Sequence, residues 1–133
     1  MARFVAVRLT ICALLCTAGC AERPLQVSGI QIGRSVNQDG SISHATSVFK
    51  PTDTIYVSVR TTDLGSGTIT VRWSYTGRLL SETSKTVSYR ISADTEFHMQ
   101  SPAEFPHGAY NVDVLVDGKP VGSRSFTVLP VGG

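Results

Sequence analysis

The stretch from Ala109 to Val128 constrains the fold more than any other part of the chain. Its first half alternates apolar with polar residues, which is the period of a strand with one buried face. Asp117-Gly118 then supplies turn residues, and a second alternating run leads to Phe126. The stretch therefore predicts a β-hairpin.

The register of this hairpin follows from the side chains that must be buried. The predicted core face consists of alternating residues from both strands: Tyr110, Val112, Val114 and Phe126. Residues directly opposite each other on paired strands point to the same face of the sheet. The numbers of two paired residues must therefore sum to an even number, because all four core residues have even numbers, and this requires an odd number of loop residues. A three-residue loop ending at Gly118 in the left-handed conformation satisfies the requirement. Asp113 is then exposed, and Pro120, which lacks an amide donor, is expected at a bulge or a free edge.

Further alternating runs predict that the rest of the chain consists of strands and turns. Strands are expected at 25–33, with a bulge at Gly29, and at 54–62, 68–76, 79–85, 86–91 and 94–100. Residues 34–46 predict a long loop or short hairpin, 64–67 a flexible turn, and 101–108 a proline-bounded corner. No window has sustained helical periodicity. About seven or eight antiparallel strands without helices predict an all-β sandwich or barrel.

The N-terminal segment has the features of a targeting signal. Arg3 and Arg8 precede an apolar run, Leu9–Ala18, that is too short for a stable membrane span. The run ends at Thr17-Ala18-Gly19-Cys20, which resembles the lipobox of bacterial lipoproteins, although that family usually has Leu at the position of Thr17. The resemblance implies cleavage of a signal peptide at residues 1–19, lipid on Cys20 and a lipidated tether over 20–24.

The same resemblance implies a location. In Gram-negative bacteria it favours the outer membrane, facing the periplasm, because Ala21 rather than Asp follows Cys20. The inner membrane and the cell surface are the alternatives. Two or three acyl chains would form a stable anchor, since each buried methylene contributes ~0.8 kcal/mol. An ordinary secretory signal or a membrane-retained helix would also fit the segment.

The net charge limits the classes of possible partner, and the cysteine content limits the possible disulfides. The chain has 12 Lys and Arg against 10 Asp and Glu, and loss of Arg3 and Arg8 with the leader leaves a formally neutral domain. General attraction to nucleic acid is therefore not expected. Cys20 would be the single cysteine of the mature chain, so no disulfide framework is expected.

A second resemblance concerns the fold. The run from Gly108 to Val112 resembles the Gly-x-Tyr-x-Cys signature of immunoglobulin-like domains, with Tyr110 at the tyrosine corner and Val112 in place of the cysteine. Trp73 resembles the core tryptophan of the third strand, and Val59 lies about where the first cysteine would be. The resemblance implies one immunoglobulin-like or fibronectin type III-like β-sandwich over residues 25–133. The resemblance implies no particular function, because this fold hosts unrelated activities.

Residues able to carry chemistry form no recognised motif. His98, Glu104 and His107 are near in sequence, but their spacing matches no compact metal site, and His44 lies in a distant loop. To act as the paired carboxylates of a glycoside hydrolase, Glu96 and Glu104 would need a cleft between them. A domain this small has little room for such a cleft.

Two other patterns are equally weak. Residues 37–41 faintly resemble a calcium loop, but the glutamate that closes such loops is absent. No Gly-x-Ser-x-Gly elbow occurs. We therefore expect no catalytic residue, no cofactor and no metal site.

These features favour a non-enzymatic binding or assembly module of the bacterial cell envelope. Loops or a free sheet edge would contact a protein or a cell-wall component, and the working loops are expected at Asn37–Ser43 and Leu64–Gly67. Tyr56, Phe105 and Leu115 are expected to be partly exposed as a contact surface. One alternative is an envelope inhibitor of a protease or lysozyme, which would need residues 37–44 to protrude. A small enzyme is the third hypothesis.

Overall fold

The computed structural model describes residues 23–132. The signal segment, Cys20 and most of the predicted tether lie outside the described residues, so their predictions stay untested. Within residues 23–132 the chain has eight strands and no helix, and hence no helix able to cross a membrane. The strands are β1 (Gln26–Gly33), β2 (Val48–Phe49), β3 (Ile55–Thr62), β4 (Gly65–Tyr75), β5 (Arg78–Tyr89), β6 (Ala93–Met99), β7 (Gly108–Val116) and β8 (Lys119–Val128).

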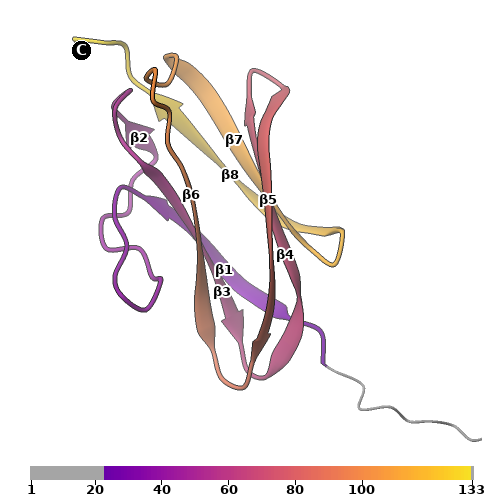
Figure 1. The fold of residues 1–133 in the computed structure, drawn as a ribbon. Helices are drawn as coiled ribbons and strands as arrows, with labels where there is room; N and C mark the ends of the chain where they lie inside the picture. Colours follow the sequence, from indigo (N-terminus) through magenta and orange to yellow (C-terminus); the bar gives the residue numbers. More distant parts are fainter. Residues whose placement is uncertain (1–22, 133) are drawn as a thin grey trace, which may run out of the picture.

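The strands form two packed sheets (Figure 1). One sheet has the order β1-β3-β6, and the other has the order β2-β8-β7-β4-β5. All pairs are antiparallel except the short β2, which runs parallel to the end of β8. This arrangement confirms the predicted all-β sandwich.

The core lies between the sheets and uses the alternating residues of both. Trp73 is 1% exposed, pairs with Val112 across β4 and β7, and lies 6.2 Å from Phe126 between ring centroids. Val59 of the opposite sheet belongs to the same core cluster. The predicted central position of Trp73 is confirmed. Burial of so many apolar side chains is the main stabilising contribution to the fold.

The tyrosine corner is also confirmed. The hydroxyl of Tyr110 donates a hydrogen bond to the backbone oxygen of Pro106 at 2.6 Å, four residues upstream. The ring is buried and stacks on Phe126 at 5.1 Å between centroids. This bond ties the loop before β7 to the sheet, which is the role of the corner in sandwiches of this kind.

The β7–β8 hairpin confirms the predicted faces but not the predicted loop. Val116 pairs with Lys119, so the loop has two residues, Asp117 and Gly118, with φ of 49° and 79°. Positive φ at both positions is typical of a type I′ turn. The prediction of a three-residue loop was therefore wrong.

A bulge corrects the register that this shorter loop creates. The pairing passes from Leu115↔Pro120 to Val114↔Gly122, so Val121 is an extra residue in β8. Beyond it the expected pairs return, and all four predicted core residues are buried: Tyr110, Val112, Val114 and Phe126. Pro120 lies beside the bulge, as predicted, whereas Asp113 is half-buried rather than exposed.

Three other predictions were wrong. Residues 65–67 are not a flexible turn but the start of β4, paired with the end of β5. The two separate strands expected at 79–85 and 86–91 are one strand, β5, which ends at Tyr89. Phe105 and Leu115 are buried, so the partial exposure predicted for them was wrong, whereas Tyr56 is half-buried, as predicted. The bulge in β1 was predicted correctly: the pairing with β3 shifts between Val27 and Gly29.

The sandwich has two distinct ends (Figure 1). We define the N-terminal end as the turns at 63–64, 90–92 and 117–118 together with Arg23 and Pro24. The C-terminal end comprises the turn at 76–77, the corner at 100–107 and residues 129–132. The 117–118 turn and the 101–108 corner lie at opposite ends, as expected for features separated by one strand.

Candidate functional site

The three histidines lie apart from one another. His98 on β6 contacts Glu96 of the same strand, with 2.6 Å between Nδ1 and Oε1. His44 lies in the β1–β2 loop, with its Nδ1 2.8 Å from the hydroxyl oxygen of Ser35. His107 contributes its backbone oxygen to the hydroxyl of Tyr75 at 2.9 Å. Within residues 23–132 no group of three or more His, Cys, Asp or Glu side chains is placed to hold a metal.

The loop at 34–47 is closed by its own hydrogen bonds. Asp39 Oδ1 accepts from both the amide and the hydroxyl of Ser41, at 3.0 and 2.5 Å. These bonds lower the pKa of the Asp39 carboxyl. Asn37 contributes an amide that donates to Ser41 Oγ at 2.9 Å. The three side chains that resembled a calcium loop therefore bond to one another and hold the loop shape.

This loop lies against the sandwich instead of projecting from it. A Cβ on Gly40 would lie 2.6 Å from the backbone oxygen of Asp94, at the start of β6. Gly33 and Ala45 form an isolated bridge at the base of the loop. The predicted working loop at 37–43 is thus a compact flap over the edge of β6.

A groove runs between this flap and β5, where the two sheets part. Its volume is about 460 Å³, and its lining comes from the flap, from β5 and from β6: Val36–Gly40, Lys85, Val87, Tyr89 and Asp94–Glu96. Lys85 crosses the groove, because its Nζ donates to the backbone oxygen of Glu96 and lies 4.8 Å from the centre of the Phe97 ring. The Tyr89 hydroxyl reaches Thr95 Oγ1 at 2.7 Å. These contacts tie the second half of β5, residues 84–89, to β6.

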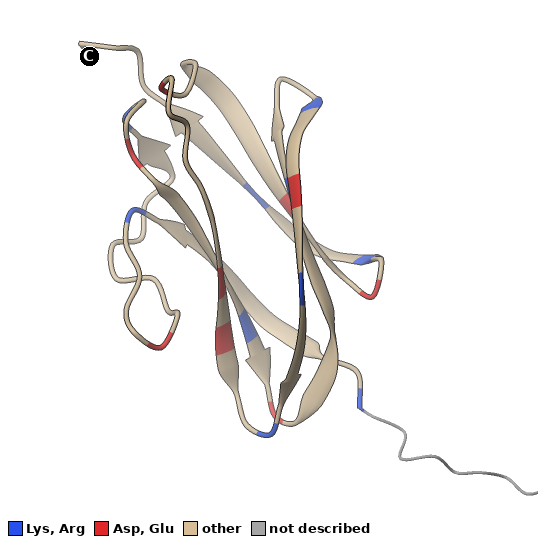
Figure 2. Ribbon diagram, in the orientation of Figure 1, with Lys and Arg blue, Asp and Glu red and all other residues tan. Residues whose placement is uncertain are grey.

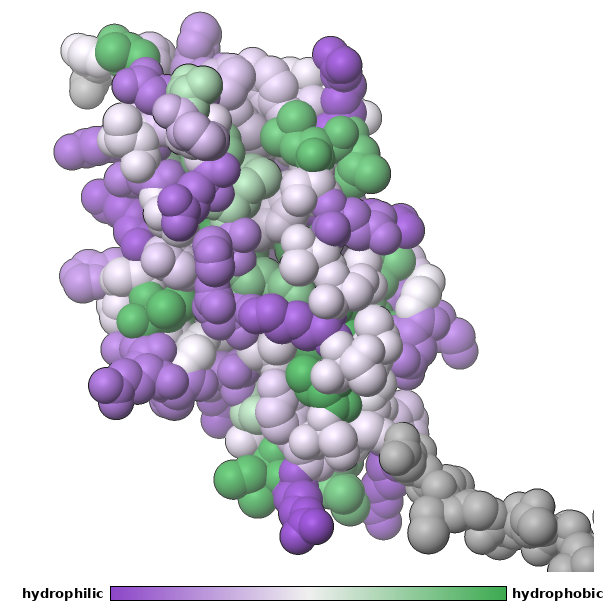
Figure 3. All heavy atoms as spheres, in the orientation of Figure 1, coloured by the Kyte–Doolittle hydropathy of each residue, from purple (hydrophilic) through white to green (hydrophobic). Residues whose placement is uncertain are grey.

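The upper half of β5, residues 78–83, instead forms a free edge of the sheet. No described strand pairs with the outer side of β5, which is the edge of the five-stranded sheet. Leu79 and Leu80 are exposed there, and Figure 3 shows hydrophobic side chains over this part of the strand. An edge strand presents a row of main-chain donors and acceptors that an extended segment can pair with. Sequence reasoning missed this edge because it divided the strand at the polar run from Glu82 to Lys85.

The outer face of β4 and β5 is a ladder of polar pairs. Arg72 pairs with Glu82 at 2.8 Å, and Thr70 and Thr68 contact Ser84 and Thr86 at 2.8 and 3.0 Å. Charges of both signs are scattered over the described domain (Figure 2). Cross-strand pairs of this kind stabilise an edge strand that is exposed on both faces.

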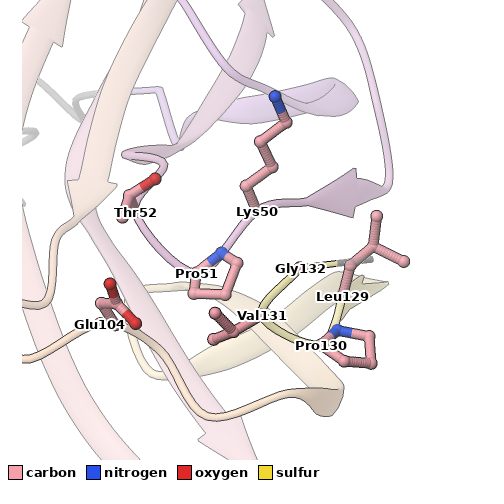
Figure 4. Close-up of a pocket in the computed structure, with 8 residues that line it drawn as sticks. All are labelled: Lys50, Pro51, Thr52, Glu104, Leu129, Pro130, Val131 and Gly132. Carbon is pink, nitrogen blue, oxygen red and sulfur yellow. The ribbon is translucent and has the colours of Figure 1, made fainter.

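A smaller pocket of about 280 Å³ lies at the C-terminal end (Figure 4). It is lined by residues of two loops and the C-terminal segment: Lys50, Pro51, Thr52, Glu104 and Leu129–Gly132. Figure 4 shows Val131 pointing towards Glu104, while Lys50 extends away from that carboxylate. Glu104 is the one carboxylate among the lining residues, so the pocket holds no pair of carboxyl groups.

Comparisons with known proteins agree with this architecture. No protein family and no curated protein matches the chain. Among solved structures, an immunoglobulin-like protein (PA1606) from Pseudomonas aeruginosa matches with a TM-score of 0.57 and 14% identity, over 82% of this chain and 99% of the other. This chain has an immunoglobulin-like fold.

A second match illustrates how little the fold says about activity. The alkylpurine DNA glycosylase AlkC from Pseudomonas fluorescens matches with a TM-score of 0.53 and 14% identity, over 83% of this chain. The match covers 32% of the glycosylase, so this chain spans about a third of that protein. At such identities the likeness concerns the fold only.

Proposed function

We propose that this chain is a non-enzymatic binding or assembly module of the bacterial cell envelope. In this proposal lipid on Cys20 holds the domain at a membrane, and the domain binds a protein or cell-wall partner. The immunoglobulin-like fold suits a rigid display scaffold. His44, His98 and His107 lie on separate elements of the described part, and this dispersal supports binding rather than catalysis in the proposal.

The observation that carries the proposal is the free edge of β5. The strand is long, lies at the end of the sheet order, and has Leu79 and Leu80 exposed beside unpaired main-chain groups. An extended partner segment would gain main-chain hydrogen bonds along this edge and apolar contacts with the two leucines. We therefore place the working surface on the upper half of β5, residues 78–83.

The loops favoured by sequence are weaker candidates. Residues 65–67 belong to β4, and the flap at 37–43 is closed by internal bonds and lies on β6. An inhibitor of a protease or lysozyme would need a loop that projects into a cleft. The flap has no such shape, so the geometry does not favour the inhibitor hypothesis.

Site-specific photo-crosslinking in native envelopes tests the proposal. A photoreactive amino acid at Leu80, which is 49% exposed, is compared with one at Val121 of β8, which is 42% exposed and is separated from β5 by the two strands β7 and β4. We expect a specific product from Leu80 and none from Val121. Thr83→Lys, which places a charge on the edge, should abolish that product without unfolding the domain. Equal products from both positions, or a Leu80 product that survives Thr83→Lys, would contradict the proposal.

A further inference from the structure

The point where the chain enters the domain fixes which end carries the tether. The amide of Ser66 donates to the backbone oxygen of Arg23 at 2.8 Å, and Pro24 forms a parallel bridge with Ser66. A Cβ on Gly65 would lie only 2.9 Å from the Pro24 oxygen, so the backbone approaches closely at that position. The described chain therefore begins at the N-terminal end, beside the first residues of β4.

Two exposed turns flank this entry point. Leu64 and Ile91 are 46% and 76% exposed, and they lie in the turns that join β3 to β4 and β5 to β6. The amide of Asp63 donates to Ser92 Oγ at 3.3 Å, which holds the two turns together. Figure 3 shows hydrophobic side chains at this lower tip, and Figure 2 shows charges of both signs there.

From these contacts we infer that the N-terminal end lies against the membrane surface, with Leu64 and Ile91 inserted into the interface of the bilayer. The inference rests on the proposed lipid anchor at Cys20. Three residue steps separate Cys20 from Arg23, and an extended chain spans at most about 3.6 Å per residue, so the entry point lies within about 11 Å of the anchored cysteine. A domain held so closely must present this end to the lipid headgroups.

The chemistry of the tip suits that position. Apolar side chains beside an arginine are typical of segments that lie in the membrane interface. Arg23 and Arg90 are balanced by Asp63 and Asp117 at the same end, so the apolar side chains, not net charge, provide the attraction. The C-terminal end, with the corner at 100–107, then faces away from the membrane, and the edge of β5 stands roughly upright between the two.

Depth-dependent quenching in vesicles tests the inference. The lipidated mature chain, from which residues 1–19 have been removed, is reconstituted into phosphatidylethanolamine and phosphatidylglycerol vesicles, with an environment-sensitive fluorophore on Ile91→Cys or on Val131→Cys. Val131 is the matched control because it is 77% exposed at the opposite end. Lipid blocks the thiol of Cys20, so only the introduced cysteine reacts. We expect a shift to shorter wavelength and loss of most emission to acyl-chain quenchers for Ile91→Cys, and neither for Val131→Cys.

The possible outcomes separate the inference from the proposed function. If the protein floats with the vesicles but both probes respond alike, or only the Val131→Cys probe is quenched, the inferred orientation is wrong and the anchor stands. If the protein does not float, the anchor is wrong and the orientation that depends on it is wrong as well.

Discussion

At the scale of single residues, Trp73 fills the centre of the sandwich. It contacts Phe126 and lies opposite Val112, with 1% of its surface exposed. We expect Trp73→Ala to lower the free energy of unfolding by about 3–5 kcal/mol, because it removes a large buried ring and leaves a cavity. Chemical denaturation measures the change. Leu79→Ala, at an exposed position, is the control and should stay within about 0.5 kcal/mol of the wild type. A denaturation midpoint that Trp73→Ala leaves unchanged would contradict the packing.

Tyr110 makes a different contribution, through its hydroxyl. Tyr110→Phe keeps the buried ring but removes the hydrogen bond to the backbone oxygen of Pro106, a residue that is itself exposed. We expect a loss of about 0.5–1.5 kcal/mol in the free energy of unfolding. Tyr56→Phe, at a half-buried position on β3, is the matched control with a smaller effect. Equal effects of the two substitutions would argue against a structural role for the corner.

The same tyrosine predicts a pH dependence. Burial, and secondarily the nearby Tyr75, raise the pKa of the Tyr110 hydroxyl above its ordinary value of 10.0. Above that pH the unfolded chain loses the proton first, so this contribution to stability is present below pH 10 and is lost as pH rises further. Denaturation curves collected from neutral to alkaline pH should show a smaller decline for Tyr110→Phe than for the wild type. Parallel declines would contradict the raised pKa.

At the scale of elements, the bulge in β8 sets the register of the whole hairpin. Deletion of Val121 would leave the two-residue turn intact and turn Phe126 away from the core. We expect the deletion variant to lose cooperative unfolding, as measured by near-ultraviolet circular dichroism during denaturation. Val121→Ala keeps the residue count at an exposed position and should behave like the wild type. A deletion variant that unfolds cooperatively with Trp73 still buried would show that the register can adjust.

The hairpin also shows what could be predicted from sequence. The alternation of apolar and polar residues identified the buried residues of the hairpin, because this pattern is visible along a few consecutive residues of the sequence. The turn was wrong because two combinations, a three-residue loop or a two-residue turn with a bulge, give the same faces. Asp117 explains the choice, since its Oδ1 accepts from the amide of Thr68 at 2.9 Å in the neighbouring strand. A contact across 49 residues leaves no local signal.

Long-range pairing explains the other differences. Residues 65–67 look like a flexible turn, yet they pair with the end of β5 and contact the incoming chain at Pro24. The polar run from Glu82 to Lys85 looks like a break, but an edge strand tolerates polar side chains on both faces. The candidate edge of β5 was therefore hidden from sequence, although a free sheet edge was foreseen as one possible contact surface.

At the scale of the whole molecule, the proposed arrangement is a small rigid domain held close to a membrane. The N-terminal end would meet the lipid, the edge of β5 would bind a partner, and the corner at 100–107 would point away. The orientation of the two ends relative to the membrane depends on an anchor at Cys20, which lies outside the described residues. The lipid attachment is therefore the claim on which the account of function depends most.

Metabolic labelling with an alkyne fatty acid tests that claim directly. The wild type, Cys16→Ser and Cys20→Ser are expressed at equal levels in a bacterium with lipoprotein processing, then immunoprecipitated and detected by coupling to a fluorophore. We predict labelling of the wild type and of Cys16→Ser, because only the cysteine after Gly19 has two small residues before it. Cys20→Ser should carry no label and should leave the membrane fraction. Equal labelling of Cys20→Ser and the wild type, or no labelling of the wild type, would contradict the anchor.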